Sequence, residues 1–320
     1  MKKFKMLPLV LILVFSVIVA GCAATPAAPA NTQPPAADQQ PAPAPAPDVD
    51  VVADAAKAYF ANMPADIYKI PQNDFVEKVK ANEDMFIMDV RQAADYDKGH
   101  INGAVNIPWG LAIADNLVNL PKDKAIMVYC YTGQTAGQTV ALLNVAGFDA
   151  KSVNLGWNLG ISKVEGVAAV TETKANAVPE GKTQVDSEIQ TAITNYFTEM
   201  TELKETTYAN FKISEDNAKK ALDSTDPNVM FLSVRKAEDY AKGHISGAIN
   251  IPFGQGMQDS FGELPTDKKI VTYCYTGQTA GQTVAILRLL GYDAVSLNSG
   301  MGMESTGSAG WVNKGFPVVQ

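Results

Sequence analysis

A long internal repeat limits the folds open to this chain more than any other feature. Six landmark residues recur 144 positions later with no insertion or deletion between them: Arg91, His100, Pro108, Cys130, Gly133 and Asn154 return as Arg235, His244, Pro252, Cys274, Gly277 and Asn298. The thirteen-residue run YCYTGQTAGQTVA stands unchanged at 129–141 and at 273–285. A period this long indicates two duplicated domains rather than a solenoid of small repeats.

The unchanged run consists mainly of Cys, Gly, Thr and Gln, a composition that contributes little to an apolar core. Each copy holds one of the three cysteines in the chain. We therefore expect this run to serve chemistry rather than packing.

The start of the chain has the pattern of an export signal. Three lysines within the first five residues precede an apolar stretch at 7–20, which is too short to span a membrane and ends in small residues. The sequence Val-Ala-Gly-Cys at 19–22 resembles the lipobox of bacterial lipoproteins, although an ordinary signal peptide with an incidental cysteine is the alternative. We expect residues 1–21 to be removed, Cys22 to receive a lipid, and the protein to be anchored at the extracytoplasmic face of a bacterial membrane.

The remaining chain divides by composition. Residues 22–53 are dominated by Ala and Pro, and proline donates no backbone hydrogen bond, so we expect a tether without a core. A proline-rich ligand motif is the alternative. The rest suits two domains of ordinary size, at 54–170 and 186–320, joined by a polar linker at 171–185.

The charge of the mature chain excludes one class of partner. Removal of residues 1–21 takes away three lysines and leaves 23 basic and 34 acidic residues, a net charge of −11. Because nucleic-acid binding rewards basic surfaces, we expect no nucleic-acid partner. No residues have metal-ligand spacing, and we expect neither metal nor cofactor. The sequence indicates no particular protein partner.

Short apolar runs alternate with helix-like segments in both repeats. Strands are expected at 86–90, 104–107, 125–130 and 152–155, and again at 230–234, 248–251, 269–274 and 295–297. Helices are expected at 74–80, 136–146 and 280–290. Strands that alternate with helices predict an α/β fold with a mainly parallel sheet in each domain. Cys130 and Cys274 then end a strand just before a helix, at the edge where such sheets place their chemistry.

The geometry of these loops favours a thiolate. Amides at a helix start lack intrahelical partners, and the helix dipole there favours negative charge. A loop that curls around the sulfur would therefore stabilise the thiolate, and a glycine would permit the turn. The residues expected to form this cup and to bind the substrate are Tyr131, Thr132, Gly133, Gln134 and Thr135, and Tyr275, Thr276, Gly277, Gln278 and Thr279.

Further residues complete a family pattern. Val90-Arg91, Tyr96, the run GHINGAVNIP and a later strand that ends in a CxxGxT loop together resemble the rhodanese-like domain. The resemblance extends over 65–166 and 208–320. It implies two tandem rhodanese-like domains and a small sulfur-containing substrate. The loop cysteines, Cys130 and Cys274, would take sulfur from thiosulfate, a polysulfide or a persulfide, become persulfides, and pass the outer sulfur to a thiophilic acceptor.

Details of the loops bear on the substrate. In this superfamily a six-residue loop such as 130–135 suits sulfur, and no arginine follows here to hold a phosphate as in the longer CX5R loop of related phosphatases. The loops also lack the Arg or Lys of many rhodaneses, so a polysulfide, a persulfide or a low-molecular-weight thiol donor suits them better than thiosulfate. Arg91 and Arg235 are the candidate anion ligands, or else salt-bridge partners within the motif. Ser233 stands where the first repeat has Asp89, so any Asp89–Arg91 pairing is absent from the second repeat.

Alternatives to catalysis remain open. A sulfur-sensing, redox-sensing or binding module would use the same fold without turnover. Cys130 and Cys274 could also be small buried side chains, or could form an interdomain disulfide in an oxidising compartment. We expect His100 and His244, both in a Gly-His-Ile context, to be structural rather than members of a Cys-His dyad.

Overall fold

The computed structural model describes residues 50–320. The expected signal peptide, the lipidation site Cys22 and the tether as far as residue 49 lie outside this range. Helix α1 (Val51–Ala61) begins directly after Asp50, whose carboxylate accepts a hydrogen bond from the Ala53 amide, so the last three residues of the expected tether are helical. Among the described residues, no helix is both long enough and apolar enough to cross a membrane.

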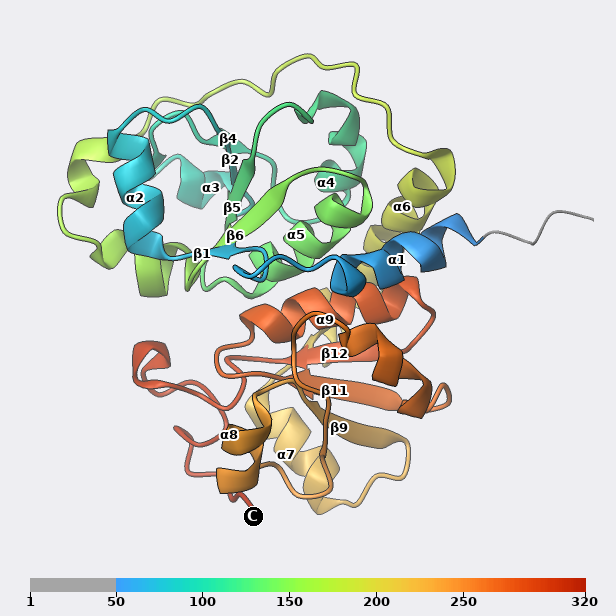
Figure 1. The fold of residues 1–320 in the computed structure, drawn as a ribbon. Helices are drawn as coiled ribbons and strands as arrows, with labels where there is room; N and C mark the ends of the chain where they lie inside the picture. Colours follow the sequence, from blue (N-terminus) through green and yellow to red (C-terminus); the bar gives the residue numbers. More distant parts are fainter. Residues whose placement is uncertain (1–49) are drawn as a thin grey trace, which may run out of the picture. The chain divides into compact units, whose positions relative to one another are not determined.

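The first repeat forms a five-stranded parallel sheet (Figure 1). Its order is β1-β6-β5-β2-β4, with the strands β1 (Lys69–Ile70), β2 (Phe86–Asp89), β4 (Val105–Asn106), β5 (Ile126–Tyr129) and β6 (Ala150–Val153). The four expected strands are confirmed with shifts of one or two residues at their ends. The sequence pattern missed β1, because two residues are too few to show an alternation.

The second repeat builds the same sheet. Its order, β10-β9-β11-β12-β8, is that of the first sheet read from the other edge, with β8 (Lys212–Ile213), β9 (Val229–Ser233), β10 (Ile249–Asn250), β11 (Lys269–Tyr273) and β12 (Ala294–Leu297), all parallel. The predicted class, two tandem α/β domains with parallel sheets flanked by helices, is confirmed.

Helices connect the strands in both repeats. They are α2 (Gln72–Lys80), α3 (Ala93–Tyr96), α4 (Leu111–Asp115), α5 (Gln134–Val145), α6 (Ser187–Glu202), α7 (Glu215–Asp223), α8 (Ala237–Lys242) and α9 (Gln278–Leu289). The expected start of α5 and α9 at the first alanine of the run was two residues late. Gly133 and Gly277, both with φ of 92°, turn the chain directly into the helix, so the Gln-Thr pair that follows already belongs to the first turn.

The segment expected as a linker covers the first domain. Strand β7 (Thr171–Glu172) pairs antiparallel with β3 (His100–Ile101), and the Glu172 carboxylate accepts from the Gly103 amide at 2.7 Å. Further along, the Thr183 hydroxyl donates to the Leu120 carbonyl at 2.6 Å. Residues 171–185 are therefore held by many local bonds rather than spanning free space.

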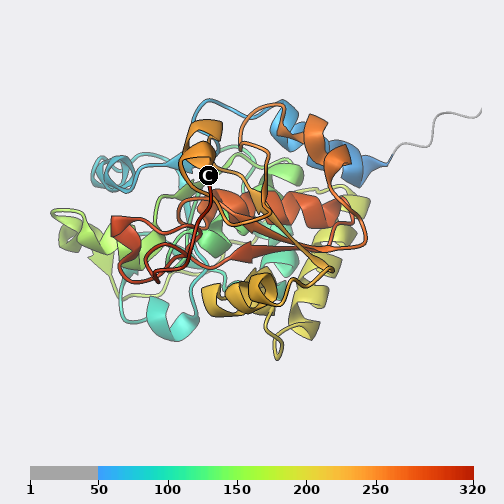
Figure 2. The same cartoon turned by 90° about the horizontal axis from the view of Figure 1, so that it is seen from below.

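The two domains share one hydrophobic core. A single buried cluster combines side chains of α1, α5, α6 and α9, and a separate cluster lies on the outer face of each sheet. Helices α5 and α9 pack against each other between the two sheets (Figures 1 and 2). A Cβ on Gly137 would lie 2.4 Å from the Gln278 carbonyl oxygen, and one on Gly281 would lie 2.4 Å from that of Gln134. Only glycine permits this approach.

This packing corrects the expectation that the identical run contributes little to a core. Four of its polar side chains, Gln138, Thr139, Gln282 and Thr283, are fully buried. The Gln138 side chain accepts from the Tyr196 hydroxyl, and the Gln282 side chain accepts from that of Tyr59 at 2.7 Å. Because the two copies of the run pack against each other, the residues of both copies have to fit the same interface between the domains.

Candidate active site

The two cysteines occupy equivalent positions in their sheets. Cys130 follows the central strand β5 and Cys274 follows β11, and each leads through a short loop into the helix that packs at the domain interface. The Gly133 amide donates to Cys130 Sγ at 3.1 Å, and the Gly277 amide donates to Cys274 Sγ at the same distance. Both thiols are only 2% exposed. An N–H group at a helix start thus faces each sulfur.

A second loop, which follows β6 or β12, braces each cysteine from behind. The Trp157 amide donates to the Cys130 carbonyl at 2.7 Å, and the Met301 amide donates to the Cys274 carbonyl at 2.8 Å. A Cβ on Gly156 would lie 2.5 Å from the Cys130 carbonyl oxygen, which leaves no room for another residue. Sequence reasoning missed this brace, although the repeated Asn-X-Gly at 154 and 298 was a usable signal.

Cys274 lines a cavity of about 330 Å³ at the domain interface. The second domain contributes the loop residues Tyr275, Thr276, Gln278 and Thr279, together with Val234, Lys236, Phe253, Met303 and Ser305. The first domain contributes Ile67, Lys69, Gln72, Asn154 and Leu155. Neither Lys69 nor Lys236 was expected at the site, because both lie far from the cysteine in sequence. The cavity combines apolar walls with two ammonium groups.

The loop tyrosines are fixed by hydrogen bonds. The Tyr275 hydroxyl donates to the Asp239 carboxylate at 2.6 Å and accepts from the Lys236 amide at 3.3 Å, and Tyr131 makes the same pair of bonds to Asp95 and Gln92. Burial, and then the bond to Asp239, raises the pKa of Tyr275 to about 12. The hydroxyl is therefore neutral, and it ties the cysteine loop to the segment after the neighbouring strand.

The side-chain amides of the loop glutamines bond to the opposite domain. Gln134 Nε2 donates to Ser296 Oγ, and Gln278 Nε2 donates to Ser152 Oγ, each at 2.6 Å. Both side chains are almost fully buried. Gln278 also lines the Cys274 cavity, while its side-chain amide donates to Ser152 at the domain interface.

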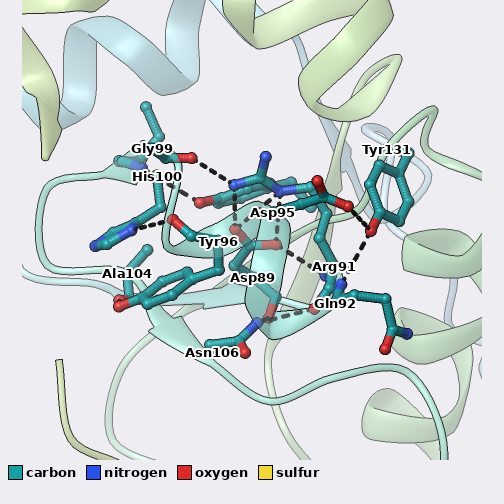
Figure 3. A network of polar contacts seen from close by, with 12 residues as sticks. Asp89, Arg91, Gln92, Asp95, Tyr96, Gly99, His100, Ala104, Asn106 and Tyr131 are labelled. Atoms are coloured by element: carbon teal, nitrogen blue, oxygen red, sulfur yellow. Dashed lines mark hydrogen bonds and ion pairs between the residues drawn. The ribbon is translucent and has the colours of Figure 1, made fainter. Parts of the chain in front are cut away.

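Arg91 is held in an ion pair with Asp89 (Figure 3). Its Nη2 lies 2.6 Å from the Asp89 carboxylate and also donates to the Gly99 carbonyl at 2.8 Å. Burial lowers the pKa of the Arg91 guanidinium, but the bond and charge of Asp89 outweigh this effect and the pKa is raised. This ion pair is the motif-internal pairing that the sequence offers as one of two roles for Arg91.

Arg235 lacks that partner. Ser233 replaces the carboxylate, the side chain is 6% exposed, and Nη2 donates to the Gly243 carbonyl. Its Nε has no hydrogen-bond partner among residues 50–320. The expected absence of the pairing in the second repeat is confirmed, and Arg235 does not line the Cys274 cavity.

The contacts of the two histidines and of the two thiols bear on the Cys-His dyad and on the interdomain disulfide. His100 Nδ1 bonds to the Tyr96 carbonyl at 2.8 Å (Figure 3). His244 Nδ1 bonds to the Tyr240 carbonyl at 3.1 Å, so each ring braces its own loop. Both Cys130 and Cys274 are free thiols in this structure. The interdomain disulfide is therefore not formed in this state.

Comparison with known proteins assigns the family. A family model for the rhodanese-like domain matches residues 72–162 and 214–304, more than half of the chain, and the chain belongs to this family. An HTH-type transcriptional regulator of Mycobacterium tuberculosis is 33% identical over 121 residues, which cover 35% of this chain and 53% of its own length. The thiosulfate:glutathione sulfurtransferase of Saccharomyces cerevisiae is 27% identical over 100 residues, 27% of this chain and 71% of its own length. The chain spans about half the length of the first of these relatives.

Among solved structures, the thiosulfate sulfurtransferase of Pseudomonas aeruginosa is similar at 18% identity and a TM-score of 0.30. The match covers 77% of this chain and 46% of that one.

Proposed function

We propose that this protein is a sulfurtransferase that carries sulfane sulfur as a cysteine persulfide. One observation carries the proposal: Cys274, with its sulfur facing a helix-start amide, lines a cavity that is large enough for a small sulfur compound. Cys130 has the same amide and the same place in its sheet, so it is the second proposed carrier. Kinship with sulfurtransferases supports this reading.

The proposed step is a displacement at sulfur. The thiolate of Cys274 attacks the outer sulfur of a donor R–S–SH, the new S–S bond to the protein forms, and the S–S bond of the donor breaks. The electron pair leaves with the inner sulfur, which takes up the proton and departs as R–SH. A thiophilic acceptor then removes the outer sulfur from the persulfide and regenerates the thiolate. The step needs no external oxidant or reductant.

The place of action is part of the proposal. We infer that Cys22 is lipidated and that residues 22–49 hold the two domains at the outer face of a bacterial membrane. The pattern of the first 22 residues supports this placement. A lipid-labelled form that disappears in Cys22→Ala, and that is found in the membrane fraction, would support it, whereas unchanged membrane association would contradict it.

The sulfur chemistry is tested by treatment of the full chain with thiosulfate, inorganic polysulfide or glutathione persulfide. Peptide mass spectrometry then seeks the mass of one added sulfur atom at Cys130 and at Cys274. We expect an adduct at Cys274 that is lost in Cys274→Ser and is discharged by cyanide or by a thiol with turnover. An adduct that forms once and is never transferred would make the protein a sensor or carrier. No adduct with any of the three donors would refute the proposal.

A further inference from the structure

Neither cysteine loop contains a cation, yet the tertiary structure brings two lysines to the Cys274 cavity. Lys236 comes from the same domain as Cys274, whereas Lys69 comes from the other domain. Lys69 opens strand β1 of the first domain and lines the Cys274 cavity of the second. Its equivalent in the second domain is Lys212, which opens strand β8 with the same Lys-Ile pair.

The register of the strands fixes the direction of the Lys69 side chain. Lys69 is paired with Ser152 of β6, and residues paired in register on parallel strands project from the same face of the sheet. Ser152 Oγ accepts from Gln278 Nε2 of the second domain, so this face is the one that meets the partner domain. The next pair, Ile70 and Val153, projects from the opposite face into the core of the first domain.

The second domain repeats the arrangement with the roles exchanged. Lys212 is paired with Ser296 of β12, and Ser296 Oγ accepts from Gln134 Nε2, in the helix that follows the Cys130 loop. The next pair, Ile213 and Leu297, projects into the core of the second domain. Each lysine therefore faces the cysteine loop of the opposite domain.

The electrostatic surroundings agree with this geometry. Burial lowers the pKa of the Lys69 ammonium, and the negative charge of the Cys274 thiolate opposes that effect. Burial likewise lowers the pKa of Lys212, and the Cys130 thiolate opposes it. Within residues 50–320, neither lysine forms a salt bridge with a carboxylate. The charge that each lysine holds is thus free to act on a thiolate or on an anionic ligand.

The size of the Cys274 cavity and the side chains that line it indicate which class of ligand it would bind. Its volume of about 330 Å³ lies within the ~300–1,000 Å³ range of small-molecule sites. Ile67, Leu155 and Phe253 line the cavity with apolar surface, while Lys69 and Lys236 add positive charge. An organic persulfide that carries a carboxylate matches both the walls and the charge.

We propose that the two domains complete each other's sulfur sites, with Lys69 serving Cys274 and Lys212 serving Cys130, and that Lys69 makes the Cys274 cavity selective for carboxylate-bearing organic persulfides. This inference rests on the proposed function for its donor class. The assignment of each lysine to the opposite domain is independent of any sulfur transfer. A separated second domain would keep Lys236 but would lack Lys69 at the Cys274 cavity.

The test compares a charged and a neutral alkylating reagent on the full chain. Iodoacetate and iodoacetamide both react with thiolates, so the ratio of their rates at one cysteine reports the local charge and not the degree of ionisation. Peptide mass spectrometry gives this ratio separately for Cys130 and Cys274. In Lys69→Met we expect the ratio to fall about threefold or more at Cys274 and to stay constant at Cys130, since the Lys69 ammonium lines the same cavity and its Coulomb attraction acts only on the charged reagent. In Lys212→Met we expect the reverse.

Two matched variants guard against indirect effects. Lys69→Arg keeps the charge and should keep the ratio. Lys151→Met removes a lysine from the strand next to β1, where Lys151 pairs with Asp66, and should change neither cysteine. An equal change at both cysteines, a change in the lysine's own domain, or no change in either lysine variant would overturn the cross-domain assignment.

The donor class is tested with glutathione persulfide against ethyl persulfide, a donor R–S–SH whose organic group carries no charge. In Lys69→Met we expect the rate of persulfide formation at Cys274 to fall at least threefold for glutathione persulfide and to stay constant for ethyl persulfide. Equal losses with both donors would refute the selectivity. Absence of any sulfur transfer in the parent protein would refute the proposed function and, with it, the donor class. The alkylation result would still decide whether each lysine acts at the cysteine of the opposite domain.

Discussion

The substitution Gly281→Ala tests whether the identical run is held by packing between the domains. Gly281 lies in α9, where an added Cβ would stand 2.4 Å from the Gln134 carbonyl oxygen of α5. This is about 1 Å inside the ~3.5 Å at which non-bonded atoms attract each other. The obstacle is a backbone atom in the first turn of a buried helix, so it cannot rotate away as a flexible side chain would. The two helices have to separate.

The expected magnitude is a balance of two effects. Alanine is a better helix former than glycine by about 1 kcal/mol. Overpacking a tight contact costs about 1–3 kcal/mol and more where backbone has to move, and a gap of ~1 Å between the helices forfeits about half of each affected contact. We therefore expect the free energy of unfolding to fall by about 1–2 kcal/mol, which corresponds to a drop in Tm of roughly 2–6 °C for a unit of this size.

Urea and thermal denaturation, followed by circular dichroism, measure this loss. Gly262→Ala is the matched control, because an added Cβ there would meet no atom within 4 Å. Gly137→Ala should resemble Gly281→Ala, since its Cβ would meet the Gln278 carbonyl at the same 2.4 Å. The double variant should lose less than the sum, because the first substitution already separates the helices. A Gly281→Ala protein that is more stable than its parent would refute the argument.

Two further predictions concern charge. Asp89→Asn leaves the buried guanidinium of Arg91 without its counter-charge and should lower the free energy of unfolding by about 3–5 kcal/mol. Ser233→Asp gives Arg235 the carboxylate that the first repeat has and should raise the free energy of unfolding. Urea denaturation checks both variants, and an Asp89→Asn protein of unchanged stability would contradict the first expectation. Because the pKa of Lys69 is lowered, its charge is lost below the ordinary range near ~10.4. The iodoacetate-to-iodoacetamide ratio at Cys274, a thiol whose cavity also holds the ammonium of Lys236, should therefore decline as the pH rises from neutral toward that range. The decline should be absent in Lys69→Met, and its persistence there would assign it to another group.

Much of the fold was readable because it depends on local pattern. The apolar composition of β2, β5, β9 and β11 predicted these strands, and the alternation of strands with helices predicted parallel sheets. Strands β1 and β8 were not predicted, because each has only two residues and is a strand only through its pairing with β6 or β12. The helix starts were placed late because a left-handed glycine acts through φ, which composition does not display.

Motif spacing and the internal repeat were enough to predict two rhodanese-like domains, each with a cysteine at the end of a strand. Periodicity and motif spacing are properties of one stretch of chain, so no tertiary information was needed. The contacts of the identical run became visible in the packing of the two domains: the two copies meet at Gly137 and Gly281, and their first glutamines bond to the opposite domain. The same packing places a lysine 205 residues before Cys274 at the cavity that Cys274 lines. Contacts between distant segments arise from the packing of two sheets, and no local pattern encodes them.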